Sequence, residues 1–181
     1  MKAFFTLLLL TAGLQADVKH DIFELYQEKQ YQEACSKGLV NFHNYRRDDE
    51  YVALYAFSCL KADFIDRLAV PISVLKFSEE ARANAAYFSV ILMQKKLLYH
   101  AVVDGYDLSQ VRLPTTDYVL SKVFDLYARD KNTEKRDVYV YRDPESPKVT
   151  YKLYTSQSGR VQKMVIEEYY DTIMTHRHIY W

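Results

Sequence analysis

The sequence contains little glycine and little proline, with four residues of each among 181. Turn-rich β proteins need both residue types at their many turns, so this scarcity favours long helices. The four glycines are scattered, which excludes a glycine-rich phosphate-binding loop, and no G-x-S-x-G nucleophile motif occurs. Because no catalytic motif is present, we expect a protein that is not an enzyme and that requires no cofactor.

An excess of charge of either sign is also missing, since 24 Lys and Arg residues balance 24 Asp and Glu residues. A protein that binds nucleic acid needs a surplus of basic side chains, so we expect no nucleic-acid partner. Beyond the first 16 residues, no run is apolar over the roughly 20 residues that a membrane-spanning helix requires. The sequence therefore predicts no transmembrane segment in the remaining chain.

Residues 1–16 have the order of a secretion signal. Lys2 precedes a short apolar run over residues 4–12, and small residues follow up to Ala16, after which Asp17 opens a charged segment. A buried N-terminal helix of a cytosolic protein is the alternative interpretation, but the run is apolar on every side and shows no amphipathic stripe. We expect cleavage after Ala16 and export to the periplasm or the medium.

Apolar residues recur at helical spacing through most of the remaining chain. Asp48 and Ser78 have side chains suited to helix starts, and Gly105 is suited to a helix end. Short polar turns separate the segments, which predicts antiparallel helix pairs. The expected helices cover residues 18–28, 31–44, 51–62, 70–77, 79–103 and 118–129.

The segment Lys-Gln-Tyr-Gln-Glu-Ala at residues 29–34 resembles the middle of a tetratricopeptide repeat, in which a Tyr-x-x-Ala pattern opens the second helix. Tyr31 and Ala34 are the matching residues. A second copy is expected at residues 62–67, where Phe64 would match the tyrosine at close to the usual repeat period and Arg67 would replace the small alanine. The resemblance covers residues 18–77 and implies stacked helix pairs with a concave binding surface.

The chain has two cysteines, Cys35 and Cys59. An even number of cysteines in an exported protein indicates a disulfide. If the helices at 31–44 and 51–62 form a hairpin that turns near Arg47, the two cysteines are equally far from the turn along the chain and lie at a similar height. The alternative is a pair of reduced thiols packed as small hydrophobic groups. We predict the Cys35–Cys59 disulfide.

The pattern changes after the polar linker at residues 131–136. Four segments rich in β-formers follow, separated by turn residues, at 138–141, 149–154, 161–168 and 172–181. They predict a small antiparallel β-meander. The expected fold is therefore mainly α, with an antiparallel helix-pair array over residues 17–130 and a β-meander over 137–181 packed on the helices.

The sequence offers one candidate metal site. His176 and His178 form His-x-His on a predicted strand, where alternation places both imidazoles on one face and allows them to bind a metal. A third ligand would have to come from Asp171, Glu167 or His43, and no pattern places any of these nearby. Solvated surface histidines are the alternative.

Tyrosine is abundant, with 17 residues, and it is enriched at binding surfaces. Tyr51, Tyr55, Tyr87 and Tyr99 are candidates to line a partner-binding groove, with core packing as the alternative. We therefore expect an exported helical-repeat-like protein that binds an envelope protein or peptide on the concave side of its helix pairs, with the β-meander as a lid or second surface. The alternative function is small-ligand or metal binding in the periplasm.

Overall fold

The computed structural model describes residues 18–130 and 136–181, so the predicted signal at 1–16 lies outside the described residues. The described chain forms six α-helices and then a four-stranded sheet, which confirms the expected fold class. The elements are α1 (Val18–Gln27), α2 (Tyr31–Tyr45), α3 (Asp49–Lys61), the 3₁₀-helix η1 (Ile65–Leu68), α4 (Ala69–Val74), α5 (Glu79–Asp104), α6 (Val119–Arg129), β1 (Val138–Arg142), β2 (Val149–Ser158), β3 (Val161–Tyr170) and β4 (Ile173–Tyr180).

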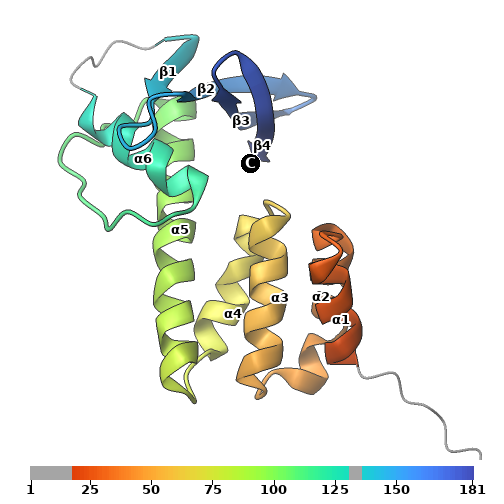
Figure 1. Cartoon of the computed structure of the whole chain (residues 1–181). Coiled ribbons are helices and arrows are strands. Elements are labelled where there is room, and N and C mark those ends of the chain that lie inside the picture. The colour runs from red at the N-terminus through yellow and green to blue at the C-terminus, as the bar shows by residue number, and fades with distance from the viewer. Residues whose placement is uncertain (1–17, 131–135) are drawn as a thin grey trace, which may run out of the picture.

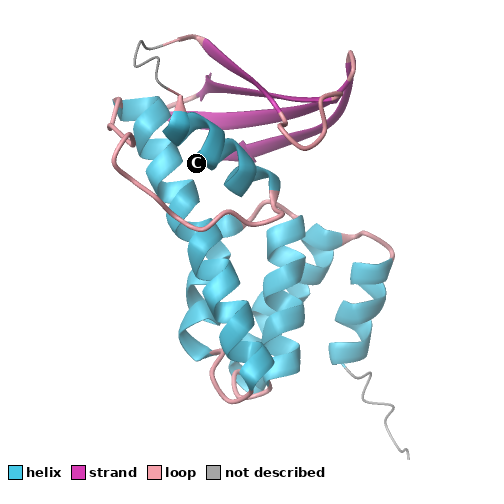
Figure 2. Cartoon of the chain, turned by 60° about the vertical axis from the view of Figure 1, so that its left-hand side comes forward, coloured by secondary structure: helices cyan, strands magenta, loops and turns pink. Residues whose placement is uncertain are grey.

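The first five helices run alternately up and down, each beside its neighbour in the chain (Figure 1). Helix α5 has 26 residues and extends beyond α1–α4 at one end (Figure 1). Its far half carries α6 and the sheet, which lie together at one end of the helical array (Figures 1 and 2). No helix in the described part of the chain has the length and apolar character needed to cross a membrane.

Three helix ends follow the chemistry expected from the sequence. The Asp48 side chain accepts a hydrogen bond from the Tyr51 amide at 3.1 Å, and the Ser78 hydroxyl accepts one from the Ala81 amide at 3.0 Å. Gly105 ends α5 in the left-handed conformation, with φ at 78°. The helix expected over 70–77 is instead η1 followed by α4, and it ends early because the backbone at Leu75 is extended.

The turns that follow α1 and α3 have the same backbone geometry. Lys29 in the first turn has φ at 62°, and Asp63 in the second has φ at 63°. The next residues, Gln30 and Phe64, also match, with ψ at 55° and 56°. Each of these two amides donates to the carbonyl five residues before it, at 2.9 Å. The same turn geometry therefore occurs twice, at the interval that separates Lys29 from Asp63.

This spacing shifts the expected alignment of the second copy by one position. Counted from the two turns, Ile65 takes the position of Tyr31, and Leu68 takes the position of Ala34. Ile65 and Leu68 are buried in the core, as Ala34 is. Arg67 is partly buried, and its guanidinium reaches the Cys35 sulfur on α2.

The predicted disulfide between Cys35 on α2 and Cys59 on α3 is confirmed. The two Cα atoms are 4.7 Å apart, and both cysteines are completely buried between the helices. The equal distance of the cysteines from the α2–α3 turn places them at the same height in the hairpin. The cross-link therefore fixes the central helix pair of the array.

Gly38 allows α2 and α3 to approach closely. A Cβ atom at this position would lie 2.6 Å from Cδ2 and 2.9 Å from Cβ of Tyr55. Because the Cβ of Tyr55 is fixed to the backbone of α3, the whole helix would have to move. The Tyr51 hydroxyl adds a buried hydrogen bond of 2.9 Å to the Gly38 carbonyl oxygen.

Replacing Gly38 with alanine is therefore expected to lower the free energy of unfolding by about 1–2 kcal/mol. Because the Tyr55 Cβ cannot move without its helix, overpacking should cost about 2–3 kcal/mol, the upper part of the usual range, and the better helix propensity of alanine recovers about 1 kcal/mol of it. Urea unfolding monitored by circular dichroism measures the change. Ser36→Ala, at an exposed position of the same helix, is the control and is expected to be neutral or slightly stabilising. A Gly38→Ala protein as stable as this control would contradict the close packing.

The sheet has the order β1-β2-β3-β4, and every neighbouring pair is antiparallel. Leu153, Ile166 and His178 lie side by side across β2, β3 and β4 on the face that meets the helices. Leu153 and Ile166 join the helical residues in one continuous core. Strands β2 and β3 are longer than expected, because β2 continues to Ser158, opposite Val161, and β3 continues to Tyr170, opposite Val149.

Candidate functional site

Three separate parts of the chain meet at the carboxylate of Asp63, in the turn between α3 and η1. The Tyr118 hydroxyl, just before α6, donates to it at 2.6 Å, and the Tyr180 hydroxyl on β4 donates at 3.2 Å. His178 Nδ1 lies 2.9 Å from both carboxylate oxygens. Asp tolerates the left-handed backbone of this turn better than most residues do. Asp63 therefore ties the helical array to the sheet.

His178 is held between two carboxylates. Its Nε2 lies 2.9 Å from Glu168 Oε1, while its Nδ1 faces Asp63. Burial alone would lower the pKa of His178, but the hydrogen bonds to Asp63 and Glu168 raise that pKa to about 9. The ring is therefore a cation at neutral pH, with both nitrogens donating. It has no lone pair to serve as a general base or a metal ligand.

This arrangement does not support the predicted metal site. His176 and His178 do share one face of β4, with ring centroids 6.1 Å apart, but the His176 side chain is 70% exposed. Among the residues that the structure describes, no cluster of three or more His, Cys, Asp or Glu side chains could hold a metal ion.

None of the three expected third ligands joins the histidines. Glu167 faces the other side of the sheet, where it accepts hydrogen bonds from Tyr154 and Tyr169 at 2.9 Å. Asp171 lies 4.0 Å from Lys148, and His43 is exposed on α2. The carboxylates beside His178 are Asp63 and Glu168 instead, so the cluster is an ion-paired junction.

The four tyrosines proposed to line a groove make contacts within the protein. Tyr51 and Tyr55 are completely buried between α2 and α3, so their assignment to a partner surface is wrong. Tyr87 and Tyr99 are partly buried on α5. The Tyr87 hydroxyl donates to Asp117 at 2.8 Å, and the Tyr99 hydroxyl donates to the Gln162 carbonyl oxygen at 2.6 Å. These two residues connect α5 to a loop and to the sheet.

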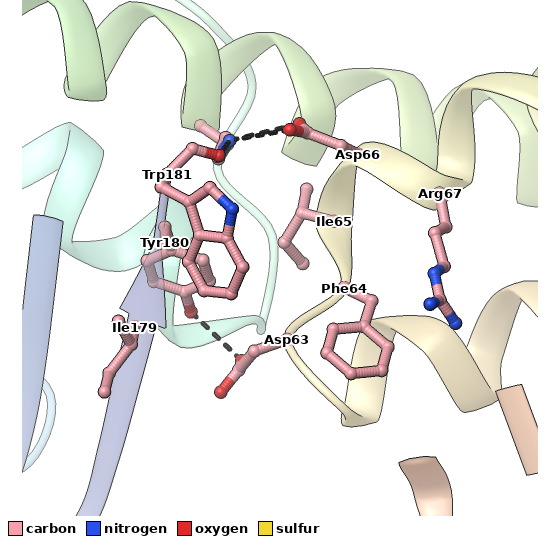
Figure 3. Close-up of a pocket in the computed structure, with 9 residues that line it drawn as sticks. Asp63, Phe64, Ile65, Asp66, Arg67, Ile179, Tyr180 and Trp181 are labelled. Carbon is pink, nitrogen blue, oxygen red and sulfur yellow. Dashed lines mark hydrogen bonds and ion pairs between the residues drawn. The ribbon is translucent and has the colours of Figure 1, made fainter. Parts of the chain in front are cut away.

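A small hollow opens beside the Asp63 junction, and we call it the turn–strand hollow (Figure 3). Its volume is about 200 Å³. The α3–η1 turn and η1 form one wall, and the end of β4 forms the other. The lining residues are Asp63, Phe64, Ile65, Asp66, Arg67, Lys95, Ile179, Tyr180 and Trp181.

Lys95 closes one end of the turn–strand hollow and is almost fully buried. Its ammonium group donates to both oxygens of Asp66, at 3.0 and 3.1 Å, and to the main-chain carbonyl oxygen of Trp181. Asp66 also receives an ion pair of 2.9 Å from Lys96. Burial works against the charge on Asp66, but the hydrogen bonds from Lys96 and Lys95 lower its pKa overall. These contacts hold the end of β4 against α5.

The other residues of the hollow offer apolar surface and one cation. The Trp181 side chain is half exposed, and the Phe64 ring faces the same opening (Figure 3). The Arg67 guanidinium lies over the Phe64 ring, 4.5 Å from its centroid, and donates to the Cys35 sulfur at 3.2 Å. The hollow thus combines aromatic walls with a positively charged edge.

Two larger hollows, each about 440 Å³, lie on the described surface, and one of them shares Asp63 with the turn–strand hollow. The hollow between α6 and residues 143–145 has no aromatic side chain in its wall. The hollow along the turns at 29–33 and 61–63 has one, Tyr31. The turn–strand hollow is lined by three aromatic residues, so it is the better candidate for binding an apolar group.

The sequence contains few signals for this site, because its parts are far apart. Asp63 stands where a helix-ending turn usually has glycine or asparagine, but Lys29 stands in the same kind of turn, so this feature does not single out Asp63. The contact between Lys95 and Trp181 spans 86 residues and has no local pattern. Glu168, Phe64 and Arg67 were missed as site residues for the same reason.

Comparisons of the chain with protein-family models, with curated proteins and with solved structures give no match.

Proposed function

We propose that this chain is an exported, helical-repeat-like binding protein that holds a segment of an envelope protein in the turn–strand hollow. The signal predicted over residues 1–16 supports export. The Cys35–Cys59 disulfide fits an oxidising compartment such as the periplasm. The interval between the two matching turns, at Lys29 and Asp63, fits the period of tetratricopeptide-type helix pairs.

The observation that carries this proposal is the half-exposed Trp181 at the edge of an aromatic hollow. Its side chain is 56% exposed, although the main chain of the same residue is fixed by Lys95. Large aromatic groups on a rigid support are typical of energetic centres in protein interfaces. The ring would gain apolar contact area when a partner covers it.

The size of the hollow favours a protein segment over a metabolite. Its volume of about 200 Å³ is below the roughly 300–1,000 Å³ typical of small-molecule sites. A space of this size suits one side chain, which is how many interfaces anchor a partner. The doubly paired His178 beside it supports a role in binding rather than catalysis, because it has no free nitrogen to accept a proton.

Photo-cross-linking in the source organism tests this function. A benzoylphenylalanine residue replaces Trp181 in one variant and Val40, which is 82% exposed on α2, in the control variant. We expect irradiation to give a discrete adduct with an envelope protein from position 181 and none from position 40. Both variants must retain the disulfide, which non-reducing electrophoresis verifies. Adducts of equal yield and pattern from the two positions, or none from either, would refute the proposal.

A further inference from the structure

We infer that the partner segment presents a carboxylate to Arg67, next to the apolar side chain that enters the turn–strand hollow. This inference rests on the proposed function and adds the chemistry of the partner. It follows from the charges around the hollow. Asp63, Asp66 and Lys95 each have an ion-pair partner of opposite charge, whereas Arg67 has no carboxylate partner among the described residues.

The two acidic residues of the hollow already have cationic partners. Asp63 accepts hydrogen bonds from His178 and from two tyrosine hydroxyls. Asp66 is paired with Lys95 and with Lys96. A cationic group on a partner would therefore have to displace an existing ion pair.

Arg67 differs from these residues. No carboxylate of the described chain lies within ion-pair distance of its guanidinium. A guanidinium group has five N–H donors, and within the described residues Arg67 uses one of them, to Cys35 Sγ. The side chain is partly buried and belongs to the wall of the hollow, with its guanidinium against the Phe64 ring, on the side of that ring away from Trp181 (Figure 3). The donors that remain suit a carboxylate, which arginine can bind through two parallel hydrogen bonds.

The apolar wall determines the rest of the partner chemistry. Phe64, Ile179 and Trp181 surround the space into which a side chain would fit. The arginine and the rings share one small hollow, so the carboxylate and the apolar side chain must be close neighbours in the partner. An extended or helical segment with Asp or Glu beside Leu, Phe or Trp meets this requirement.

Selection from a random peptide library displayed on phage tests the inference. Three immobilised proteins are used in parallel: the unchanged chain from residue 17 with its disulfide formed, Arg67→Gln, and the control Arg47→Gln. Arg47 is exposed at the opposite end of the hairpins and makes no contact with the hollow. Thermal unfolding and the disulfide are verified for each protein before selection.

We expect the unchanged protein and Arg47→Gln to enrich peptides with Asp or Glu beside an apolar residue, and Arg67→Gln to lose the acidic preference. A second measurement does not depend on the folding of Arg67→Gln. An enriched peptide whose Asp or Glu is replaced by Asn or Gln should bind the unchanged protein about tenfold or more weakly, because a charge-assisted pair is lost.

The results separate this inference from the function on which it rests. Peptides enriched without an acidic residue, or amide peptides that bind as well as the acidic ones, would overturn the carboxylate inference and leave peptide binding standing. An acidic preference that persists in Arg67→Gln would assign the carboxylate to another cation. The absence of any enriched peptide would count against both proposals.

Discussion

Replacing Asp63 with alanine is expected to lower the free energy of unfolding by about 4 kcal/mol. The substitution removes the acceptor for three hydrogen bonds and leaves the buried His178 cation with one carboxylate. Losing one partner of a buried ion pair costs about 3–5 kcal/mol. Alanine also tolerates φ of 63° less well than aspartate does. Urea unfolding at pH 7 measures the loss.

Two further variants separate charge from backbone conformation. Asp63→Asn keeps an acceptor oxygen and tolerates the left-handed turn, so it removes mainly the charge, and we expect a loss of about 2 kcal/mol. Asp171→Asn is the control, because Asp171 also has positive φ but is exposed. This control substitution should change the free energy of unfolding by less than about 0.5 kcal/mol. Equal, small losses for the alanine variant and the control would contradict the role of Asp63.

The same junction gives the protein a defined pH dependence. The pKa of His178 is raised from 6.5 to about 9 in the folded state. The stabilisation that the charged His178 gives the folded state is therefore fully present below pH 6.5. As the pH rises through 9 this stabilisation is lost, and the free energy of unfolding falls by about 3 kcal/mol. In Asp63→Asn the loss over the same range should be smaller. A wild-type free energy of unfolding that stays constant from pH 6 to 9.5 would rule out the doubly paired imidazolium.

Removing the disulfide is the second change with a large expected effect. In the double variant Cys35→Ala, Cys59→Ala, the free energy of unfolding should fall by about 3–4 kcal/mol, because the cross-link no longer restricts the unfolded chain across 24 residues. The loss is a large fraction of the roughly 5–15 kcal/mol typical of a domain. It should appear as a lower urea midpoint.

Chemical reduction of the unchanged protein provides the matched comparison. Reduced protein and the double variant should unfold at similar urea concentrations, both below the oxidised protein. The disulfide is completely buried, so reduction should be slow under native conditions and fast once the hairpin opens. If the double variant and the oxidised protein had the same midpoint, the cross-link would have no part in stability.

Local sequence chemistry was sufficient to predict most of the helices and strands. Asp48, Ser78 and Gly105 mark helix ends by hydrogen-bonding or backbone preferences that act over short distances in the chain, and each lies where expected. The disulfide was predictable because the turn near Arg47 relates Cys35 to Cys59 by simple distance along the chain.

The candidate site depended on contacts that the sequence does not encode locally. Asp63 and His178 are 115 residues apart, and their pairing depends on how the sheet packs against the array. The alternation along β4 correctly placed both histidines on one face, but it could not show that Asp63 and Glu168 occupy the nitrogens of His178. Burial explains the misassigned tyrosines, since Tyr51 and Tyr55 lie on helix faces that meet each other.

The most direct test of the central claim uses the fluorescence of Trp181, which is the only tryptophan in the chain and lines the turn–strand hollow. The unchanged protein is titrated with an enriched acidic peptide that contains no tryptophan, in the presence of acrylamide as a quencher. The account predicts a saturable shift of the emission to shorter wavelength and protection from quenching, with both effects much weaker in Arg67→Gln. Binding measured by calorimetry with no change in Trp181 emission would place the peptide elsewhere and contradict the account.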